Sequence, residues 1–419
     1  MKRSYSSADI LLPNFNETDP NAWAVIACDQ FTSQPDYWKK AEEIVGDKPS
    51  TLNMILPEVY LSETEKRLPI INATMKEYEK DLLVCHKNSM IYVEREQSDG
   101  SIRQGLMLAV DLETYDYKKG ADSLIRATEA TVVERIPPRV AIRRGATIEL
   151  PHVMLLIDDP DKTVIEPLAD ESFENVAYDT PLMLGGGSIK GYFLSEESQK
   201  KLSLALDALT TPESMEKRYG NGALAPLLFA VGDGNHSLAS AKATYEEIKT
   251  KLGDDAADHP ARYALVEVVN IHSDALKFEP IYRVMFNVEP QKLLDELSDY
   301  IENLDGEAEA QTIEYVSAEL CGKLTVKSPK RQLTVGTLQD FLDLYIGAHP
   351  EAEIDYIHGE AALCELAKSE NALGFIFDGM SKDQLFKTVI YDGALPRKTF
   401  SMGHAEDKRY YMECRKISR

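Results

Sequence analysis

Short apolar runs and longer amphipathic segments alternate along the 419 residues of this chain. Residues 90–95 and 103–110 are strand-like and flank a Ser-Asp-Gly-Ser turn, which predicts a β-hairpin. Buried strands are expected at 22–28 and 225–231, further strands at 152–157 and 262–269, and a shorter strand at 280–286. Helices are expected from residue 35 onward, at 195–209 and at 237–251.

From about residue 288 the pattern changes to a regular alternation of helices and strands. Helices are expected at 291–304, 338–346, 360–368 and 382–390, and strands at 354–357 and 373–377. Such alternation is typical of α/β architecture. We therefore expect an α/β fold in two parts. These are a main domain at 1–287, built on a mixed α+β sheet core, and a C-terminal α/β lobe at 288–419.

An excess of acidic residues limits the expected partners. The chain has 70 aspartates and glutamates against 46 lysines and arginines, a formal net charge of −24. Because such a surface repels polyanions, we expect neither nucleic acid nor an anionic membrane as a partner. A small anionic ligand would need a local positive pocket, and the simplest meaning of the acidity is solubility.

Cysteine usage and the first residues bear on the compartment. The five cysteines are scattered and include no Cys-x-x-Cys pair, which argues against a disulfide scaffold or a zinc knuckle. The first residues contain an apolar stretch too short for a signal peptide or a spanning helix. We therefore expect a cytoplasmic protein.

The loop Gly232-Asp233-Gly234-Asn235-His236 joins an expected strand to an expected helix. The first amides of a helix lack internal acceptors and the helix dipole adds positive charge, so a phosphate or carboxylate fits there. Gly232 and Gly234 would let the backbone approach a ligand. Asp233 could hold Mg²⁺ or accept a proton. His236 could bind a phosphate oxygen or act as a general acid or base.

A simpler interpretation of the same loop stays open. Asp-Gly is a common turn dipeptide, and Asn235 or Ser237 could do no more than cap the helix. The phosphate-loop spacing Gly-x-x-x-x-Gly-Lys-Ser/Thr is absent from the sequence, as are His-x-x-x-His and Gly-x-Ser-x-Gly.

Three further segments are candidates for the same site. Gly185–Lys190 could wrap an anion or be a mobile turn. Lys398–Ser401 and His404 could close the site or merely solvate the C-terminal tail. A group of arginines could supply positive potential, or could pair with Glu129 and Glu134 on a solvated surface. The group consists of Arg126, Arg135, Arg139, Arg143 and Arg144.

Taken in order, several segments resemble the domain-of-unknown-function family 1015. Phe229–Ala241 resembles the hallmark strand, loop and helix of that family, which commonly contain Ala-Asp-Gly-His-His-Arg. Ala27–Ser33 resembles its Pro-Tyr-Asp-type loop, and Arg126–Thr131 resembles its Arg-His-Glu-x-Thr segment. Asp274–Arg283 resembles its Asp-x-Leu and Pro-Thr-His-Arg segments, and Pro396–Phe400 its closing Pro-x-Lys-Ser-Thr. The resemblance covers nearly the whole chain.

The hallmark loop is also similar to the nucleotide-phosphate loop of the ParB/sulfiredoxin superfamily, in which free serine kinases carry an Asp-Gly-His-type loop. This resemblance implies a core fold of that type and nucleotide or phosphate binding. The chain departs from the pattern at Asn235, where a histidine is usual, and at Ser237, where an arginine is usual. Losing the arginine removes a bidentate phosphate clamp, which Lys242, Arg283 or the arginine group could replace.

The expected site therefore draws on distant segments. We expect Asp233, His236, Asp29 and Glu129 to carry catalysis, with Asp233 holding the metal. The residues expected to bind nucleotide or phosphate are Gly232, Gly234, Asn235, Ser237, Arg126, Arg283 and Lys398. Since Lys398 is among them, the end of the C-terminal lobe is expected to return to the site.

Three functions fit these features. The first is transfer of a phosphoryl group from Mg-ATP or Mg-ADP to a small hydroxyl-bearing metabolite such as an amino acid, with Asp29 or Glu129 as base. The second is a non-catalytic nucleotide or metabolite sensor, in keeping with the missing arginine. The third is a structural protein with a vestigial site. A small-molecule ligand is the expected partner, and the substrate, the nucleotide and a homo-oligomer are left open.

Overall fold

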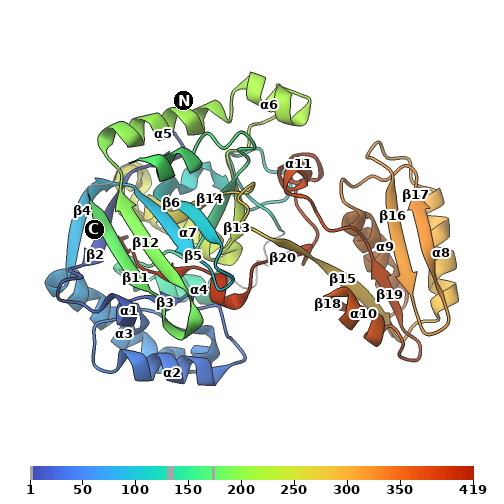
Figure 1. Ribbon diagram of the computed structural model, residues 1–419, viewed down its shortest axis with the longest axis horizontal. Helices are drawn as coiled ribbons and strands as arrows, with labels where there is room; N and C mark the ends of the chain where they lie inside the picture. The colour runs from blue at the N-terminus through green and yellow to red at the C-terminus, as the bar shows by residue number, and fades with distance from the viewer. Residues whose placement is uncertain (1–2, 130–135, 172–174) are drawn as a thin grey trace. The chain divides into compact units, whose positions relative to one another are not determined.

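The computed structural model describes residues 3–129, 136–171 and 175–419, and the chain divides into two units (Figure 1). Unit 1 comprises Met1–Ala127, Thr131–Leu276 and His404–Arg419. Unit 2 comprises Thr128–Ala130 and Lys277–Gly403. The division falls before residue 278, rather than after residue 287, because every described strand that pairs with the strand at 278–286 belongs to unit 2.

A ten-stranded mixed sheet forms the centre of unit 1. Its strands are β1 (Tyr5–Ser6), β5 (Ile91–Glu96), β6 (Ile102–Asp111), β7 (Tyr115–Asp116), β8 (Ile125–Ala127), β10 (Met154–Ile157), β11 (Val176–Pro181), β12 (Ser188–Phe193), β13 (Phe229–Asp233) and β14 (Tyr263–Asn270). They lie in the order β11-β12-β5-β6-β14-β10-β13-β8-β7, with β1 beside β6. Strand β10 runs parallel to β14 and antiparallel to β13.

Helices and three small sheets complete unit 1. The helices are α1 (Pro20–Trp23), α2 (Pro35–Val45), α3 (Thr64–Asp81), α4 (Ile136–Arg143), α5 (Glu196–Ala208), α6 (Pro212–Tyr219) and α7 (Asn235–Leu252). The two-stranded sheets pair β2 (Ala8–Pro13) with β4 (Leu83–Ser89), β3 (Val25–Ile26) with β21 (Tyr410–Tyr411), and β9 (Ile148–Glu149) with β22 (Arg415–Lys416). The run at 22–28, expected as one strand, ends α1 and forms only the short β3, because Asp19 caps a helix that begins at Pro20.

The central strands are buried on both faces. Met107 and Ala109 of β6 face a core that includes residues of α2 and α3. Leu106 and Leu108, the alternate residues, face a second core that includes residues of α5 and α7. Because successive side chains point to opposite faces, a strand covered on both sides is apolar throughout. This explains the continuous apolar run that the sequence shows at 105–110.

Unit 2 is built on a six-stranded sheet in which every pairing found is antiparallel. Its strands are β15 (Phe278–Phe286), β16 (Gln311–Val316), β17 (Cys321–Val326), β18 (Glu353–His358), β19 (Leu373–Ile376) and β20 (Phe400–Met402). They lie in the order β17-β16-β19-β15-β18, with β20 beside β15. The helices are α8 (Pro290–Glu302), α9 (Thr334–Ala348), α10 (Glu360–Leu366) and α11 (Lys382–Asp392).

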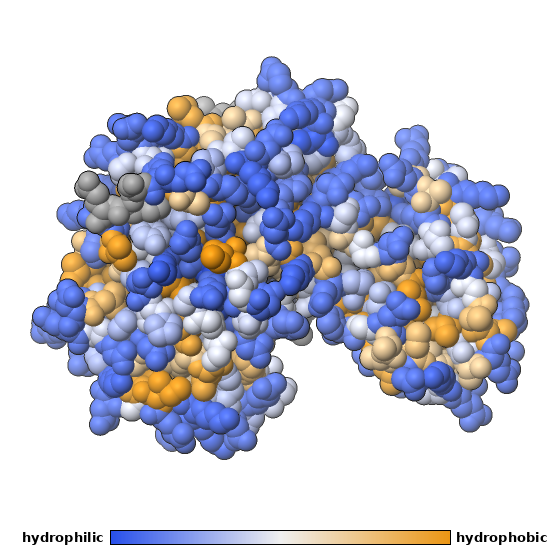
Figure 2. Space-filling model, in the orientation of Figure 1, coloured by the Kyte–Doolittle hydropathy of each residue, from blue (hydrophilic) through white to orange (hydrophobic). Residues whose placement is uncertain are grey.

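The α/β class expected from the sequence is confirmed, since both units combine sheets and helices. Most of the surface seen in Figure 2 is hydrophilic, in keeping with the net charge of −24. In the described part of the chain, none of the helices has the length and apolar character needed to span a membrane.

A buried cluster of charges holds the last residues of the chain in unit 1. Glu267 of β14 is fully buried, accepts a hydrogen bond from Nη1 of Arg409 at 2.9 Å and lies 3.5 Å from Nε of Arg103. Burial raises the pKa of Glu267, but the charges of Arg103 and Arg409 outweigh it and the pKa is lowered overall. Gly105 of β6 is required here, because a Cβ atom would lie 2.4 Å from Oε1 of Glu267.

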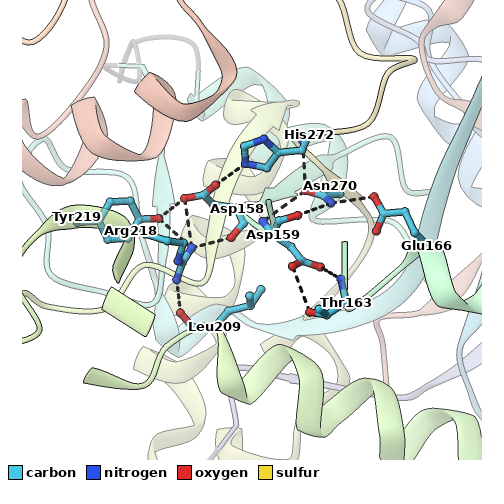
Figure 3. Close-up of polar contacts among 9 residues, drawn as sticks. All are labelled: Asp158, Asp159, Thr163, Glu166, Leu209, Arg218, Tyr219, Asn270 and His272. Atoms are coloured by element: carbon cyan, nitrogen blue, oxygen red, sulfur yellow. Dashed lines mark hydrogen bonds and ion pairs between the residues drawn. The ribbon is translucent and has the colours of Figure 1, made fainter. Parts of the chain in front are cut away.

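The far end of β10 is fixed by a second buried carboxylate, that of Asp158 (Figure 3). It accepts hydrogen bonds from the hydroxyl of Tyr219 at 2.5 Å and from Nη1 of Arg218 at 3.2 Å, and it pairs with Nε2 of His272 at 2.7 Å. Burial raises the pKa of Asp158. The hydrogen bonds from His272 and Tyr219 and the charge of Arg218 outweigh it, so that the pKa lies below the ordinary 3.8.

Removing one partner of the Glu267 cluster should be costly. We expect Arg409→Met to lower the free energy of unfolding of unit 1 by about 3–5 kcal/mol, because a buried carboxylate loses its counter-charge. Both tryptophans of the chain, Trp23 and Trp38, are buried in unit 1, so their fluorescence in urea reports this transition. Lys190→Met, which breaks an exposed pair with Asp179, should leave the free energy of unfolding nearly unchanged. Equal effects of the two substitutions would contradict the prediction.

Asp158 should make unit 1 sensitive to acid. The pKa of Asp158 is lower in the folded than in the unfolded chain. Its contribution to the free energy of unfolding is therefore complete above pH 3.8 and is lost as the pH falls through the folded pKa. We expect Asp158→Asn to be less stable than the parent chain near neutral pH, with a difference that shrinks below pH 3.8. Urea unfolding followed by tryptophan fluorescence measures this. Asp161→Asn, at an exposed pair with Lys217, should follow the parent chain at every pH.

Candidate functional site

The loop singled out in the sequence joins β13 to α7 in unit 1, as expected. Gly234 is the N-cap of α7 in a left-handed conformation, with φ of 81°, and the structure shows no side-chain hydrogen bond at this cap. Asn235 is therefore the first helical residue and Ser237 the third, and neither caps the helix. Residues 232–237 are all partly exposed. The first turn of α7 thus presents its amides at the surface of unit 1.

The two glycines of the loop are explained by packing against β10. A Cβ atom at Gly232 would lie 2.8 Å from Cγ of Leu156. A Cβ atom at Gly234 would lie 3.0 Å from Cα of Val153, in addition to the positive φ. The space that glycine leaves is therefore filled by the neighbouring strand. The sequence had suggested ligand access as the reason for both glycines.

Asp233 is held at the end of β13 by two contacts. Its Oδ1 accepts a hydrogen bond from the amide of Gly234 at 2.8 Å. Its Oδ2 forms an ion pair with Nζ of Lys408 at 3.1 Å, and the two side chains are 30% and 19% exposed. Among the described residues no group of three or more His, Cys, Asp or Glu side chains could hold a metal ion. Asp233 is therefore a single carboxylate beside a cation.

A chain of polar contacts connects this loop to the end of β3. Gly234 packs against Val153, which follows His152 in the sequence. Nδ1 of His152 lies 2.8 Å from the hydroxyl of Tyr411. The same hydroxyl accepts a hydrogen bond from the amide of Cys28 at 3.1 Å. Burial raises the pKa of Cys28 to about 12, so its thiol stays protonated at neutral pH.

Asp29 follows Cys28 directly and lies in the same neighbourhood. Its negative charge acts on both Cys28 and Tyr411 and raises their pKa values beyond the effect of burial. Its Oδ1 accepts a hydrogen bond from Nε2 of Gln30 at 3.0 Å. A series of contacts through Cys28, Tyr411 and the His152-Val153 pair therefore links Asp29 to the loop at 232–237.

The arginine group is divided in the described part of the chain. Arg139, paired with Glu58, acts electrostatically on Cys28, whereas Arg126 is used elsewhere. Arg126 is buried, and its guanidinium donates to the carbonyl oxygens of Ser123 at 2.8 Å and Ala225 at 2.9 Å. These carbonyls lie before β8 and β13, whereas the loop follows β13. The other described members are paired with glutamates, namely Arg139 with Glu58, Arg143 with Glu149 and Arg144 with Glu247. Arg135 and Glu134 lie outside the described residues.

Glu129, Arg283 and Lys398 gather in unit 2. Arg283 is fully buried and donates to Oε1 of Gln339 at 3.1 Å and to the carbonyl of Lys398 at 3.0 Å. Burial lowers its pKa to about 10, and the charge of Glu129 acts in the opposite direction. Nζ of Lys398 lies 5.0 Å from the ring centre of Tyr356. The hydrogen bonds found for Arg283 therefore all go to acceptors of unit 2, and its guanidinium stabilises the fold of that unit.

The Gly185–Lys190 segment is a packed turn between β11 and β12. A Cβ atom at Gly186 would lie 2.4 Å from the hydroxyl of Tyr410, and one at Gly187 would lie 2.2 Å from the carbonyl oxygen of Glu96. Lys190 pairs with Asp179 at 3.1 Å. Close packing therefore explains Gly186 and Gly187, whereas Gly185 has open space around it.

Sequence reasoning missed His152, Lys408 and Tyr411. The missed signal was the buried apolar run Tyr410–Met412 near the C-terminus, which indicates that this segment enters a core. Its short β21 pairs with β3, and this pairing places Tyr411 beside Cys28.

Comparison with known proteins gives weak structural likenesses and one family. A free serine kinase in complex with AMP is 12% identical, over 74% of this chain and 91% of that chain, with a TM-score of 0.37. A conserved hypothetical protein from Pyrococcus furiosus is 11% identical, over 74% and 95%, with a TM-score of 0.33. SbnI with a C-terminal truncation, from Staphylococcus aureus, is 10% identical, over 71% and 82%, with a TM-score of 0.34.

Likenesses at this level say nothing about the ligand or activity of this chain. No curated protein matches the sequence. The family described as protein of unknown function, DUF1015, matches residues 13–345, which is most of the chain. The chain therefore belongs to the DUF1015 family.

Proposed function

We propose that the chain binds a nucleotide through its phosphates at the start of α7 and transfers a phosphoryl group to a small hydroxyl-bearing metabolite. The observation that carries the proposal is the start of α7 itself. An 18-residue helix begins at the surface of unit 1 without a side-chain cap, and its loop carries the Asp233–Lys408 ion pair. Amides at a helix start and a lysine are the donors that phosphate groups require.

The neighbouring side chains supply roles for the remaining steps. Of the two bases expected from the sequence, Asp29 belongs to the same unit as the loop, so we assign it the proton of the acceptor hydroxyl. His236, in the first turn of α7, would donate to a phosphate oxygen. His152 is held by Tyr411 at the edge of the loop and would contact the same ligand.

Asp233 is the residue that would hold Mg²⁺. Magnesium in such sites is bound by one or two carboxylates together with phosphate oxygens, so a single aspartate is sufficient. The metal would neutralise charge on the transferred group. When Asp233 turns to the metal, Lys408 is released from its ion pair and would donate to a phosphate oxygen instead.

A non-catalytic sensor is the second candidate, favoured by the state of Asp233. Both of its carboxylate oxygens are engaged, one by the amide of Gly234 and one by Lys408. With Ser237 at the position of the usual arginine, Lys408 is the cation seen at the loop in the described part of the chain. A nucleotide held by amides and this lysine, with Asp233 still paired, would bind without transfer.

Lys408 should contribute strongly to nucleotide binding. Charge-assisted hydrogen bonds are worth about 1.5–3 kcal/mol, so we expect Lys408→Met to weaken the binding of Mg-ADP and Mg-ATP roughly tenfold or more. Isothermal titration calorimetry measures this. Lys416→Met is the matched control. Lys416 lies in the same C-terminal segment as Lys408, is half-exposed and pairs with Glu79. Unchanged binding in Lys408→Met, or no binding by the parent chain, would refute the proposed site.

Turnover separates the two candidate functions. The protein is incubated with Mg-ATP or Mg-ADP and a pool of amino acids and small hydroxyl metabolites, and nucleotide products are measured. We expect turnover in the parent chain and a loss to background in His236→Ala. His358→Ala, at an exposed pair with Glu279 in unit 2, should retain the parent rate. Binding without any turnover above that of His236→Ala would favour the sensor.

A further inference from the structure

Unit 2 contains a cavity of about 220 Å³ that the proposed function does not use. It lies where β19 ends, between the first residues of α9 and one side of α11. Its lining is rich in amide and hydroxyl side chains and includes Gln311, Gln332, Thr334, Lys387, Thr388 and Thr399. Every lining residue belongs to unit 2, so the cavity is complete within that unit.

The polar lining is held in place by internal hydrogen bonds. Nε2 of Gln311 donates to the carbonyl of Arg331 at 2.7 Å, and its Oε1 accepts from the hydroxyl of Thr337 at 2.7 Å. The hydroxyl of Thr388, which is fully buried, donates to the backbone carbonyl of Gln384 at 2.7 Å. Because these side chains are already fixed, a ligand would lose little free energy in ordering them.

Lys387 supplies the positive charge in the lining. It is half-buried, and within the described ranges no ion pair is found for it. Other lysines of unit 2 do have partners, such as Lys323 with Glu314 at 2.5 Å and Lys330 with Asp305 at 2.7 Å. Withdrawing an ammonium group from water is unfavourable unless it is paired. An anionic group in the cavity would satisfy Lys387.

Two carboxylates line the same cavity, those of Glu309 and Asp378. Both residues are exposed, in contrast to Lys387, and neither has an ion pair within the described ranges. One half-buried cation and two exposed carboxylates favour a ligand that carries both charges. The volume limits its size. At about 30 Å³ per water molecule, 220 Å³ is roughly seven waters, which is below the range of cofactor pockets.

We propose that unit 2 binds a small zwitterion of the α-amino acid class in this cavity. The carboxylate of the ligand pairs with Lys387, and its ammonium group faces Glu309 and Asp378. The amides of the uncapped first turn of α9, which begins at Thr334, add donors for the same carboxylate. This inference goes beyond the proposed function, because it concerns a second ligand site in a different unit.

The full-length protein without nucleotide is titrated calorimetrically with each standard amino acid. Any amino acid that binds is tested again as its N-acetyl derivative and as its methyl ester, which lack the positive and the negative charge respectively. We expect at least one amino acid to bind and both derivatives to bind roughly tenfold more weakly or worse. Binding by no amino acid, or equal binding by a derivative, would overturn the proposal.

Variants locate the site. Lys387→Met and Asp378→Asn should each weaken the binding about tenfold. Thr334→Val, an isosteric change in the lining, should weaken the binding as well. Lys368→Met, which breaks an exposed pair with Glu365 in the same unit, should bind as the parent chain does. Lys408→Met should also bind the amino acid normally. If binding is lost in Lys408→Met and kept in Lys387→Met, the ligand occupies the α7 site, so this proposal fails while the proposed function stands.

Discussion

The buried carboxylate of Glu267 is the constraint on which the candidate site depends. It lies fully buried on a central strand, and its charge is balanced by Arg103 of β6 and by Arg409 from the far end of the chain. An unpaired carboxylate in this position would be strongly destabilising, so the last residues of the chain have to be in place for the sheet to be stable. Gly105 is the matching feature on β6, because a side chain there would occupy the space of the carboxylate.

Other contacts extend this constraint along the C-terminal segment. Arg103 also donates to the carbonyl of Asp407 at 2.7 Å, and Trp23 donates to the carbonyl of Met412 at 2.9 Å. The residues between these anchors include Lys408 and Tyr411. Lys408 reaches Asp233, and Tyr411 connects Cys28 with His152. The start of α7 thus acquires a cation and a set of polar neighbours from a segment more than 170 residues away in the sequence.

The residues expected from the sequence fall into two groups when the fold is known. Asp29, Asp233 and the first turn of α7 belong to unit 1, whereas Glu129, Arg283 and Lys398 belong to unit 2. Arg126 and Arg283 are arginines of the kind that bind phosphates elsewhere, yet both donate to carbonyl oxygens of their own unit. The sequence does not show whether an arginine is buried, and burial decides whether the guanidinium faces a ligand or the backbone.

Local periodicity and turn chemistry were enough to predict the α/β class, most long helices and the strand, loop and helix around Asp233. The apolar runs of β6 and β14 likewise predicted strands, and the structure shows that these strands are buried on both faces. The folded structure was needed to show that Gly232 and Gly234 make room for β10, that Lys408 is the partner of Asp233 and that the last residues belong to unit 1. The physical reason is that each of these depends on contacts between segments distant in sequence, which pack together only after the sheet has formed.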